Sequence, residues 1–509
     1  MPSLSQPLAL APPAGAASVA WPAAALFALP EKVLQFGTGV LLRGLPDFLI
    51  DQANRQGIFN GRVVVVKSTD GGDLAAFERQ NGLYTVAVRG VAEGQPVEAN
   101  VVCASISRVL SAKNQWADIL AFAASPDLQV VVSNTTEVGI QFVNESILLA
   151  PPQSFPGKLL AVLYARFQAF GGDAGRGLVI VPTELIPDNG ARLEAIVLEL
   201  AHRNDLGCAF IDWLETANYF CNSLVDRIVP GRPAAAAYEA LQARLGYHDE
   251  LLTVAESYCL WAIEGNEHVR DVLSFHRAAP GVVIQPDISL FRELKLRLLN
   301  GTHTLSFALA HLAGFATVRE AFANEPFARF VECLMLKDLL PGIPCPVPAQ
   351  LGEQFGLQVL DRFRNPYLEH RWLAISAQAT AKMQLRAIPA LLHFYAQRGE
   401  VPHHFALGFA AYLLFLRGAA QAGAYMGQAN GRPYAIEDER GAYFADLWAR
   451  LRPDELTANA LHNTTLWGHD LTRLPRFAEC VSQYLHQLLE LGATATLTDF
   501  LARKTAPVN

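Results

Sequence analysis

The sequence lacks the features that mark three large classes of protein. It has no concentrated cluster of Lys and Arg, and its 40 basic residues are outnumbered by 48 acidic ones, for a formal charge of -8. Because proteins bind a phosphate backbone through basic clusters, no nucleic-acid partner is expected. The chain also lacks an uninterrupted apolar run of about 18 residues, so no membrane span is expected.

Paired cysteines are missing too, and so is a signal peptide. No two cysteines form a C-x-x-C motif, which argues against a structural zinc or redox site. Isolated thiols are typical of reduced core residues in a cytosolic protein. The N-terminus has no basic region, and Pro22 and Pro30 interrupt its apolar stretch. Residues 1–28 are therefore predicted to be a loosely ordered arm of a cytoplasmic protein. The cysteines are Cys103, Cys208, Cys221, Cys259, Cys333, Cys345 and Cys480.

What the chain does have is enough apolar sequence for two cores. It is 509 residues long, with 51% apolar and 17% charged residues, which is the balance of a folded globular protein. The N-terminal half begins with VLQF (33–36), a glycine turn (37–39) and a segment of helical periodicity, and RVVVV (62–66) follows. This order predicts a βαβ unit whose strands are buried on both faces, as in a parallel sheet.

The remaining pattern divides the chain near residue 285. Alternating strand and helix signals before that point predict an α/β, Rossmann-like, dinucleotide-binding domain over 29–285. Leu, Ala and Phe at helical spacing after it predict a mostly α-helical substrate and catalytic domain over 286–509. The further strand candidates are 84–90, 128–133 and 177–182, with a helix around 158–170, and the helical stretches are 286–335, 350–395 and 403–425.

The glycine turn has part of a dinucleotide-binding fingerprint. Gly37 and Gly39 would let a pyrophosphate approach the backbone at the start of a helix. The full G-x-G-x-x-G pattern needs a third glycine where this chain has Leu42, followed by Arg43. A tight turn without a ligand is the alternative.

Two loops after predicted strands are further cofactor candidates. After RVVVV, Asp70 could bind the adenosine ribose and favour NAD, whereas Lys67 could equally favour the phosphate of NADP. SNTTE (133–137) follows another strand and is either a nicotinamide-side loop or a polar turn. The candidate cofactor contacts are Phe36, Gly37, Thr38, Gly39, Arg43, Asp70, Asn134 and Thr135.

The segment LKLRLLNGTH holds three polar side chains beside an apolar stripe. At about 100° per α-helical residue, Lys295 and His303 lie about 80° apart, with Asn300 about 60° beyond His303. Reduction of a ketone by hydride needs a proton donor and hydrogen bonds to a developing alkoxide. Lys295 can donate the proton, and with a lowered pKa it can also act as the base in the oxidative direction. Asn300 can bind the oxygen, and no metal is needed. A solvated helix face with a capping Asn is the alternative.

These residues and two other segments resemble the polyol-specific long-chain dehydrogenases, which include mannitol dehydrogenases and hexuronate-pathway reductases. KLRLLNGTH (295–303) resembles the family's catalytic stretch, NSLVDRIVP (222–230) its V-D-R-I signature, and QFGTGVLLR (35–43) its variant glycine turn. Asn218 departs from the signature's apolar first position. The resemblance runs from about 33 to 390 and implies the same two-domain order.

The resemblance also implies roles for single residues. Lys295 matches the general acid/base, and Asn300 and Asn189 match oxyanion-stabilising asparagines. His303 matches a substrate-positioning histidine, and Asp226 a residue that supports the site, although a structural pair with Arg227 is an alternative.

Within the family, the sequence PTELIPDNG (182–190) most resembles that of the tagaturonate reductases, also called altronate oxidoreductases. That implies reduction of D-tagaturonate, a small-molecule sugar acid, to D-altronate with NADH. The carboxylate of such a substrate needs a cation, for which Arg371 and Lys382 are the candidates, unless both are surface charges. The alternatives are a fructuronate (mannonate) reductase, a mannitol-type polyol dehydrogenase and, in another class, a non-catalytic dinucleotide or sugar-acid sensor.

Overall fold

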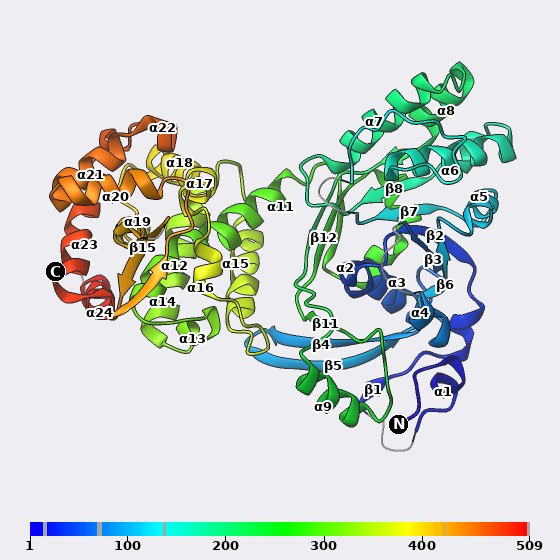
Figure 1. The fold of residues 1–509 in the computed structure, drawn as a ribbon, viewed down its shortest axis with the longest axis horizontal. Helices are drawn as coiled ribbons and strands as arrows, with labels where there is room; N and C mark the ends of the chain where they lie inside the picture. Colours follow the sequence, from blue (N-terminus) through cyan, green and yellow to red (C-terminus); the bar gives the residue numbers. More distant parts are fainter. Residues whose placement is uncertain (14–17, 69–73, 136–138, 422, 506–509) are drawn as a thin grey trace. The chain divides into compact units, whose positions relative to one another are not determined.

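The computed structural model describes residues 1–13, 18–68, 74–135, 139–421 and 423–505, and the chain forms two units (Figure 1). Unit 1 comprises Met1–Gly90 and Pro96–Ile288, and unit 2 comprises Val91–Gln95 and Ser289–Asn509. In the described ranges no helix combines the length and apolar composition that a membrane crossing requires.

A six-stranded sheet forms the centre of unit 1. Its strand order is β6-β3-β2-β7-β8-β9, and every pair of neighbours is parallel. The predicted α/β, Rossmann-like fold is therefore confirmed, including the βαβ unit from β2 to β3. The strands are β2 (Glu31–Phe36), β3 (Arg62–Lys67), β6 (Ile106–Ser111), β7 (Val130–Ser133), β8 (Val179–Pro182) and β9 (Tyr219–Phe220).

Both faces of this sheet are covered, because successive side chains of a strand point to opposite sides. Val63 and Val65 pack into a cluster with side chains of α2 (Val40–Gly44) and α3 (Pro46–Arg55). Val64 and Val66 pack into a second cluster with side chains of α5 to α8. These helices are α5 (Trp116–Ala123), α6 (Phe155–Phe170), α7 (Asn189–Arg203) and α8 (Cys208–Ala217).

One predicted strand belongs to a different sheet. Residues 84–90 do form a strand, but β4 (Tyr84–Ala92) lies in a four-stranded sheet of order β1-β5-β4-β11. The other members are β1 (Val19–Ala20), β5 (Gln95–Cys103) and β11 (Thr253–Glu256), and a three-stranded sheet contains β10 (Ser223–Asp226), β12 (Leu260–Glu264) and β13 (Val282–Gln285). The remaining α-helices described in unit 1 are α1 (Gln6–Leu10), α4 (Ala75–Arg79), α9 (Ala235–Leu245) and α10 (Glu267–Val272).

The N-terminal residues are more ordered than the predicted loose arm. Leu4 is fully buried and its N–H donates to the carbonyl of His248 at 2.8 Å. Ala9 and Val19 are buried in the same cluster as Tyr247. These scattered apolar side chains pack into the core of unit 1. Composition alone does not reveal this packing.

Unit 2 is mostly helical, as predicted, with one small sheet. The predicted helix over 403–425 ends at Phe415, and an antiparallel sheet of β14 (Gly418–Gln421), β15 (Ala424–Ala429) and β16 (Arg432–Ala435) follows. A Cβ on Gly418 would lie 2.5 Å from Ile436 Cδ1 and 3.0 Å from the carbonyl oxygen of Met426, so a larger residue there would force the Ile436 side chain to shift. The α-helices are α11 (Ser289–Leu294), α12 (Thr302–Leu312), α13 (Val318–Phe322), α14 (Glu325–Cys333), α15 (Ala349–Phe363), α16 (Trp372–Ser376), α17 (Ala379–Lys382), α18 (Ile388–Arg398), α19 (His403–Phe415), α20 (Gly441–Arg450), α21 (Pro453–His462), α22 (Thr464–Trp467), α23 (Phe477–Leu491) and α24 (Ala493–Thr505).

Among the described residues of unit 2, three segments are wound as π-helix, which is rare and often found at functional sites. They are η4 (Lys295–Gly301), η5 (Leu334–Leu339) and η7 (Met383–Ala387), and η4 contacts both of the others. The buried Arg297 of η4 donates through Nη1 to the carbonyl oxygens of Leu385 and Arg386 at 2.6 and 2.8 Å. Arg297 thereby joins η4 to η7.

Candidate functional site

The predicted glycine turn lies where the strand order of the parallel sheet reverses. The turn follows β2, whose neighbours are β3 on one side and β7 on the other. In open α/β sheets, ligands bind outside the carboxyl ends of strands at this switch point. Gly37 has a φ of +127°, and a Cβ there would lie 2.8 Å from the carbonyl oxygen of Asn134. A Cβ on Gly39, by contrast, would meet no described atom within 4 Å, so the backbone there is open to a ligand.

Arg43 supports this turn from within unit 1. Arg43 is 8% exposed, and its guanidinium donates to the carbonyl of Thr38 at 2.8 Å and lies over the ring of Phe77. Burial lowers the pKa of Arg43, with the nearby Tyr84 and Asp47 opposing the shift. The structure therefore shows Arg43 fixing the shape of the turn, a contact to backbone that sequence spacing did not reveal.

The loops after β7 and β8 are joined by hydrogen bonds. Asn134 Nδ2 donates to the carbonyl and hydroxyl oxygens of Thr183 at 3.1 and 3.0 Å. The N–H and hydroxyl of Thr135 both donate to Glu184 Oε1, and Ser133 Oγ donates to Oε2. The buried Glu184 carboxylate thus fixes the described part of the predicted SNTTE loop beside the glycine turn.

The ribose side of the predicted cofactor site is described only up to Ser68. Asp70 lies outside the described residues. Lys67, the last residue of β3, is half-buried, and Ser68 follows it at the carboxyl end of the sheet. Among the described residues, the buried Oγ of Ser68 has no hydrogen-bond partner. A buried hydroxyl without a partner at this edge is suited to a ligand that brings one.

A buried acid and amide lie directly beneath the glycine turn. Gln35 Nε2 donates to Asp47 Oδ2 at 3.1 Å and to the carbonyl of Gly37 at 3.4 Å. Burial raises the pKa of Asp47 to about 7, although the bond from Gln35 lowers it. Among described atoms, Asp47 Oδ1 and Gln35 Oε1 have no partner. A proton on the Asp47 carboxyl would remove the cost of burying its negative charge at this position.

This pair predicts a pH dependence of stability. An unfolded Asp has a pKa near 3.9, so between pH 4 and 7 the folded state binds the extra proton and stability falls as pH rises. Replacing Asp47 with Asn, which mimics the neutral acid, should remove a slope of roughly 1.4 kcal/mol per pH unit. Urea unfolding of both proteins from pH 4.5 to 7.5 measures the difference, and parallel curves would show that Asp47 is ionised throughout.

Asn189 was predicted to stabilise an oxyanion, but its side chain forms hydrogen bonds with the backbone of unit 1. It is fully buried as the first residue of α7, and its Nδ2 donates to the carbonyls of Pro182, Glu184 and Ser223 at 3.0 to 3.2 Å. Its Oδ1 accepts from the N–H groups of Gly190 and Ser223. The amide hydrogens are thus used by backbone carbonyls, which differs from the oxyanion contact that the resemblance implied.

Asp226 also lies in unit 1. It is the last residue of β10, is 7% exposed, and pairs in register with Leu260 of β12. Its neighbour Arg227 donates to the carbonyls of Glu256 and Gly44. The V-D-R segment therefore holds backbone segments of unit 1 together.

In unit 2, π-winding changes the relation among Lys295, Asn300 and His303. Lys295 begins η4 and Asn300 lies near its end, so the two are five residues apart. Five residues span one hydrogen-bonded π turn, which places them on the same side of the helix. An ideal α-helix would put them about 140° apart. Lys295 and Asn300 are half-buried, and His303 follows on α12.

His303 is buried among cations and aromatic rings. Its ring lies 4.3 Å from that of Phe363 and 5.4 Å from that of His370, between centroids. Burial lowers its pKa well below the usual value, and the charges of His370, Arg362, Arg386 and Lys382 lower it further. His303 is therefore neutral at neutral pH. Within the described residues its buried Nδ1 has no hydrogen-bond partner, so it can bind a substrate hydroxyl.

The two predicted carboxylate-binding residues have different surroundings. The Arg371 side chain is 72% exposed and pairs with Glu369 at 3.1 Å. Lys382 is half-buried, lies close enough to affect His303, and donates to the carbonyl of Ile375 at 3.0 Å. Arg386, a half-buried residue of η7, was not among the residues predicted from the sequence. Its position four residues after Lys382 was a signal that could have indicated a shared face.

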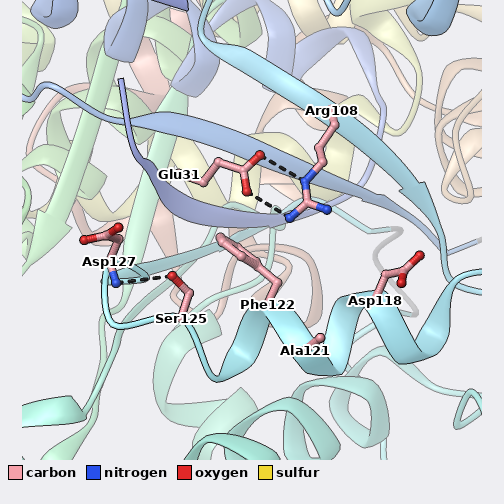
Figure 2. A pocket seen from close by; sticks show the side chains of 7 residues that line it. All are labelled: Glu31, Arg108, Asp118, Ala121, Phe122, Ser125 and Asp127. Carbon is pink, nitrogen blue, oxygen red and sulfur yellow. Dashed lines mark hydrogen bonds and ion pairs between the residues drawn. The ribbon is translucent and has the colours of Figure 1, made fainter. Parts of the chain in front are cut away.

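A hollow of about 390 Å³ lies at the other end of the parallel sheet (Figure 2). It is lined by Glu31, the first residue of β2, whereas the glycine turn follows the last. Its Arg108 is paired with Glu31 at 2.9 Å, and Asp118 and Asp127 also line it. The carboxylates make this hollow unsuited to an anionic dinucleotide.

No group of three His, Cys, Asp or Glu side chains is placed to bind a metal ion in the part of the chain that the structure describes.

Known families match both units. The model of the mannitol dehydrogenase Rossmann domain matches residues 31–276, and that of the mannitol dehydrogenase C-terminal domain matches residues 287–489. The chain is 39% identical to an altronate oxidoreductase of Halalkalibacterium halodurans over 484 residues, covering 93% of this chain and 94% of the relative. It is 36% identical to an altronate oxidoreductase of Bacillus subtilis over 476 residues, covering 92% and 95%.

Two solved structures share the fold. Mannitol 2-dehydrogenase of Pseudomonas fluorescens, solved with NAD and D-mannitol, has a TM-score of 0.64 and 23% identity over 98% of this chain and 99% of that one. A substrate-free D-sorbitol dehydrogenase has a TM-score of 0.73 and 20% identity over 98% and 100%.

The Rossmann-type sheet and the Lys–Asn–His segment on a helical unit are those of an oxidoreductase of the dehydrogenase class. The chain belongs to the mannitol dehydrogenase family, because both family models and relatives at more than 30% identity match across nearly its whole length. The family predicted from three short motifs is confirmed.

Proposed function

We propose that this enzyme is a NAD-dependent oxidoreductase of hexuronate metabolism that reduces the keto group of D-tagaturonate and forms D-altronate. The observation that carries the proposal is the set of cations around His303, because a sugar acid, unlike a polyol, needs a cationic partner for its carboxylate. The two altronate oxidoreductases that match over more than 90% of the chain support the same substrate.

Unit 1 would hold the dinucleotide at the switch point. The backbone at Gly39 leaves room for a pyrophosphate, Gly37 provides the tight turn beside it, and Ser68 Oγ is a buried hydroxyl without a described partner at the ribose side. Asn134 and Thr135 belong to the adjoining loop, where hydrogen bonds to Thr183 and Glu184 hold them in place. These residues fit NAD, which when bound supplies or accepts the hydride.

Unit 2 would handle the proton and the substrate. Lys295 donates a proton to the carbonyl oxygen as it becomes an alkoxide, and takes it back in the oxidative direction. Asn300, one π turn away, donates an amide hydrogen to the same oxygen. Neutral His303 orients a neighbouring hydroxyl through Nδ1, which has no hydrogen-bond partner among the described residues. The lysine provides the proton transfer, so the proposed chemistry needs no metal.

The substrate carboxylate is assigned to Arg386 and Lys382. Both lower the pKa of His303, which places their positive charges near that ring. Burial lowers the pKa of Arg386 itself, so this guanidinium has already lost part of its hydration. A partly desolvated arginine binds a carboxylate more strongly than an exposed one, such as Arg371.

A substrate panel tests the proposal. With NADH and a chelator present, turnover of D-tagaturonate should exceed that of fructuronate, fructose and other ketoses, and NADPH should be a poorer donor. Loss of activity with chelator would contradict the metal-independent chemistry. A clear preference for fructuronate or for a neutral ketose would overturn the substrate while leaving the family membership unchanged.

A further inference from the structure

A cysteine, a histidine and an aspartate form a connected cluster elsewhere in unit 2. Cys333 is the last residue of α14, Asp338 lies in η5, and His404 lies in the first turn of α19. None of them belongs to the Lys–Asn–His segment. Cys333 is half-buried, whereas Asp338 and His404 are 6% and 8% exposed.

Hydrogen bonds fix the histidine ring of this cluster. Asp338 Oδ1 lies 3.2 Å from His404 Nδ1, and Asp338 Oδ2 accepts the backbone N–H of Phe405 at 3.0 Å. The carboxylate is thus held against the start of α19 while it orients the imidazole. Because Nδ1 is used by Asp338, Nε2 is the ring nitrogen left for the hydrogen bond between His404 and the Cys333 thiol.

The charges of the cluster favour an ion pair. Burial opposes protonation of His404, but its bonds to Asp338 and Cys333 outweigh burial and raise its pKa to about 9. The hydrogen bond from His404 lowers the pKa of Cys333 against the effect of burial, and Lys337 adds to the lowering while Glu332 opposes it. A thiolate beside a protonated histidine is the arrangement that makes a cysteine nucleophilic.

Cys333 opens onto a cavity with an excess of positive charge. The cavity has a volume of about 420 Å³, and Cys333 and His404 line it together with Arg329, Lys337 and Arg398. The acidic residues that line it are Asp338, which is bound to His404, and Glu400, which lies 3.9 Å from Arg398. His403 also lines it and is bonded to Tyr484.

We propose that Cys333 is a thiol-modification site that reacts with small acidic disulfides, with His404 and Asp338 as its positioning residues. The Cys333 thiolate attacks one sulfur of the disulfide, a new S–S bond forms to Cys333, and the old S–S bond breaks. The leaving thiolate takes the proton of His404, so the products are a mixed disulfide on Cys333 and one free thiol. The cations of the cavity bind the acidic groups of the disulfide.

The other cysteines are internal controls for this reaction. Cys208 is exposed, so its reaction rate shows the effect of solvent exposure alone. Cys103 and Cys221 are buried, and burial raises the pKa of each. An ordinary thiol loses about tenfold in thiolate fraction per pH unit below its pKa of about 8.5. Cys333 should therefore differ most from Cys208 at mildly acidic pH.

The experiment treats the full-length protein with the dianionic disulfide dithiobis(nitrobenzoate), and separately with the dicationic disulfide cystamine. Peptide mass spectrometry then gives a rate for each cysteine between pH 6 and pH 9. At pH 6.5, Cys333 should react with the anionic probe at least about tenfold faster than Cys208, and the ratio of its rates with the anionic and cationic probes should exceed the same ratio for Cys208, which corrects for the different leaving groups of the two disulfides. In urea-unfolded protein the two cysteines should react alike.

A variant separates the role of His404 from that of access. His404→Gln should slow Cys333 about tenfold at pH 6.5 and leave Cys208 unchanged. If the variant does not fold, the comparison of Cys333 with Cys208 in the wild-type protein still decides. A Cys333 rate no higher than that of Cys208 at pH 6.5, or a ratio of rates with the two probes no higher than that of Cys208, would overturn the proposal.

Discussion

Replacing Lys295 with alanine is expected to lower kcat for tagaturonate reduction by about 10³-fold, because general acid catalysis contributes on the order of 10² to 10⁴. The affinity for NADH should not change, since the residues proposed to hold the cofactor lie in unit 1 and Lys295 lies in unit 2. Steady-state kinetics measure the loss of turnover, and fluorescence titration of NADH measures binding.

The matched variants for this prediction are Lys295→Met and Asn300→Ala. Methionine keeps the length of the side chain without its proton, so it should lose as much turnover as alanine does. Asn300→Ala removes one hydrogen bond to the developing alkoxide and should cost on the order of 10² to 10³ in kcat. A small added amine should partly restore the Lys295→Ala variant. If that variant keeps near-normal turnover, the proton comes from another group.

Replacing Arg386 with alanine is expected to lower kcat/KM for tagaturonate by roughly 10- to 100-fold, the equivalent of about 1.5–3 kcal/mol for a hydrogen bond to a charged group. The loss should be absent with a neutral six-carbon ketose, whose slower reduction does not use a carboxylate contact. The backbone carbonyl of Arg386 accepts from Arg297 and is kept in the variant.

Arg371→Ala is the matched control, because it removes an arginine that is exposed and paired with Glu369. It should leave kcat/KM for both substrates unchanged. An equal loss with the acid and the neutral ketose would mean that Arg386 acts on the fold of unit 2 and not on the carboxylate. If kcat/KM for tagaturonate falls in Arg371→Ala and not in Arg386→Ala, the substrate carboxylate binds Arg371, one of the two residues predicted from the sequence.

Much of the fold could be predicted because local sequence patterns correspond to it. The valines at 63–66 are buried on both sides, and such a run has few solutions other than a central parallel strand. Residues 84–90 form a strand as predicted, but they belong to a different sheet. Strand pairing is a long-range choice, and nothing within the segment distinguishes pairing with β5 and β11 from pairing with β2.

The residue types of the candidate site could be predicted from the sequence, whereas their arrangement in space could not. Ideal α-helical angles separated Lys295 from Asn300, whereas the structure winds this segment as π-helix. That winding depends on packing and on Arg297, which donates to carbonyls of η7. The same limit explains why Arg371 and Lys382 were predicted from the sequence and Arg386 was not, because only tertiary structure shows which cations are half-buried near His303.

The π-helical winding of η4 has a consequence for protein engineering. A π turn contains one residue more than an α turn, so a single-residue deletion between Lys295 and Asn300 would allow the segment to rewind as α-helix. The lysine and asparagine would then stand four residues apart and still share a side of the helix. Grafting this pair onto the regular helix of a designed scaffold therefore calls for K-x3-N spacing, whereas copying the natural K-x4-N would misalign it.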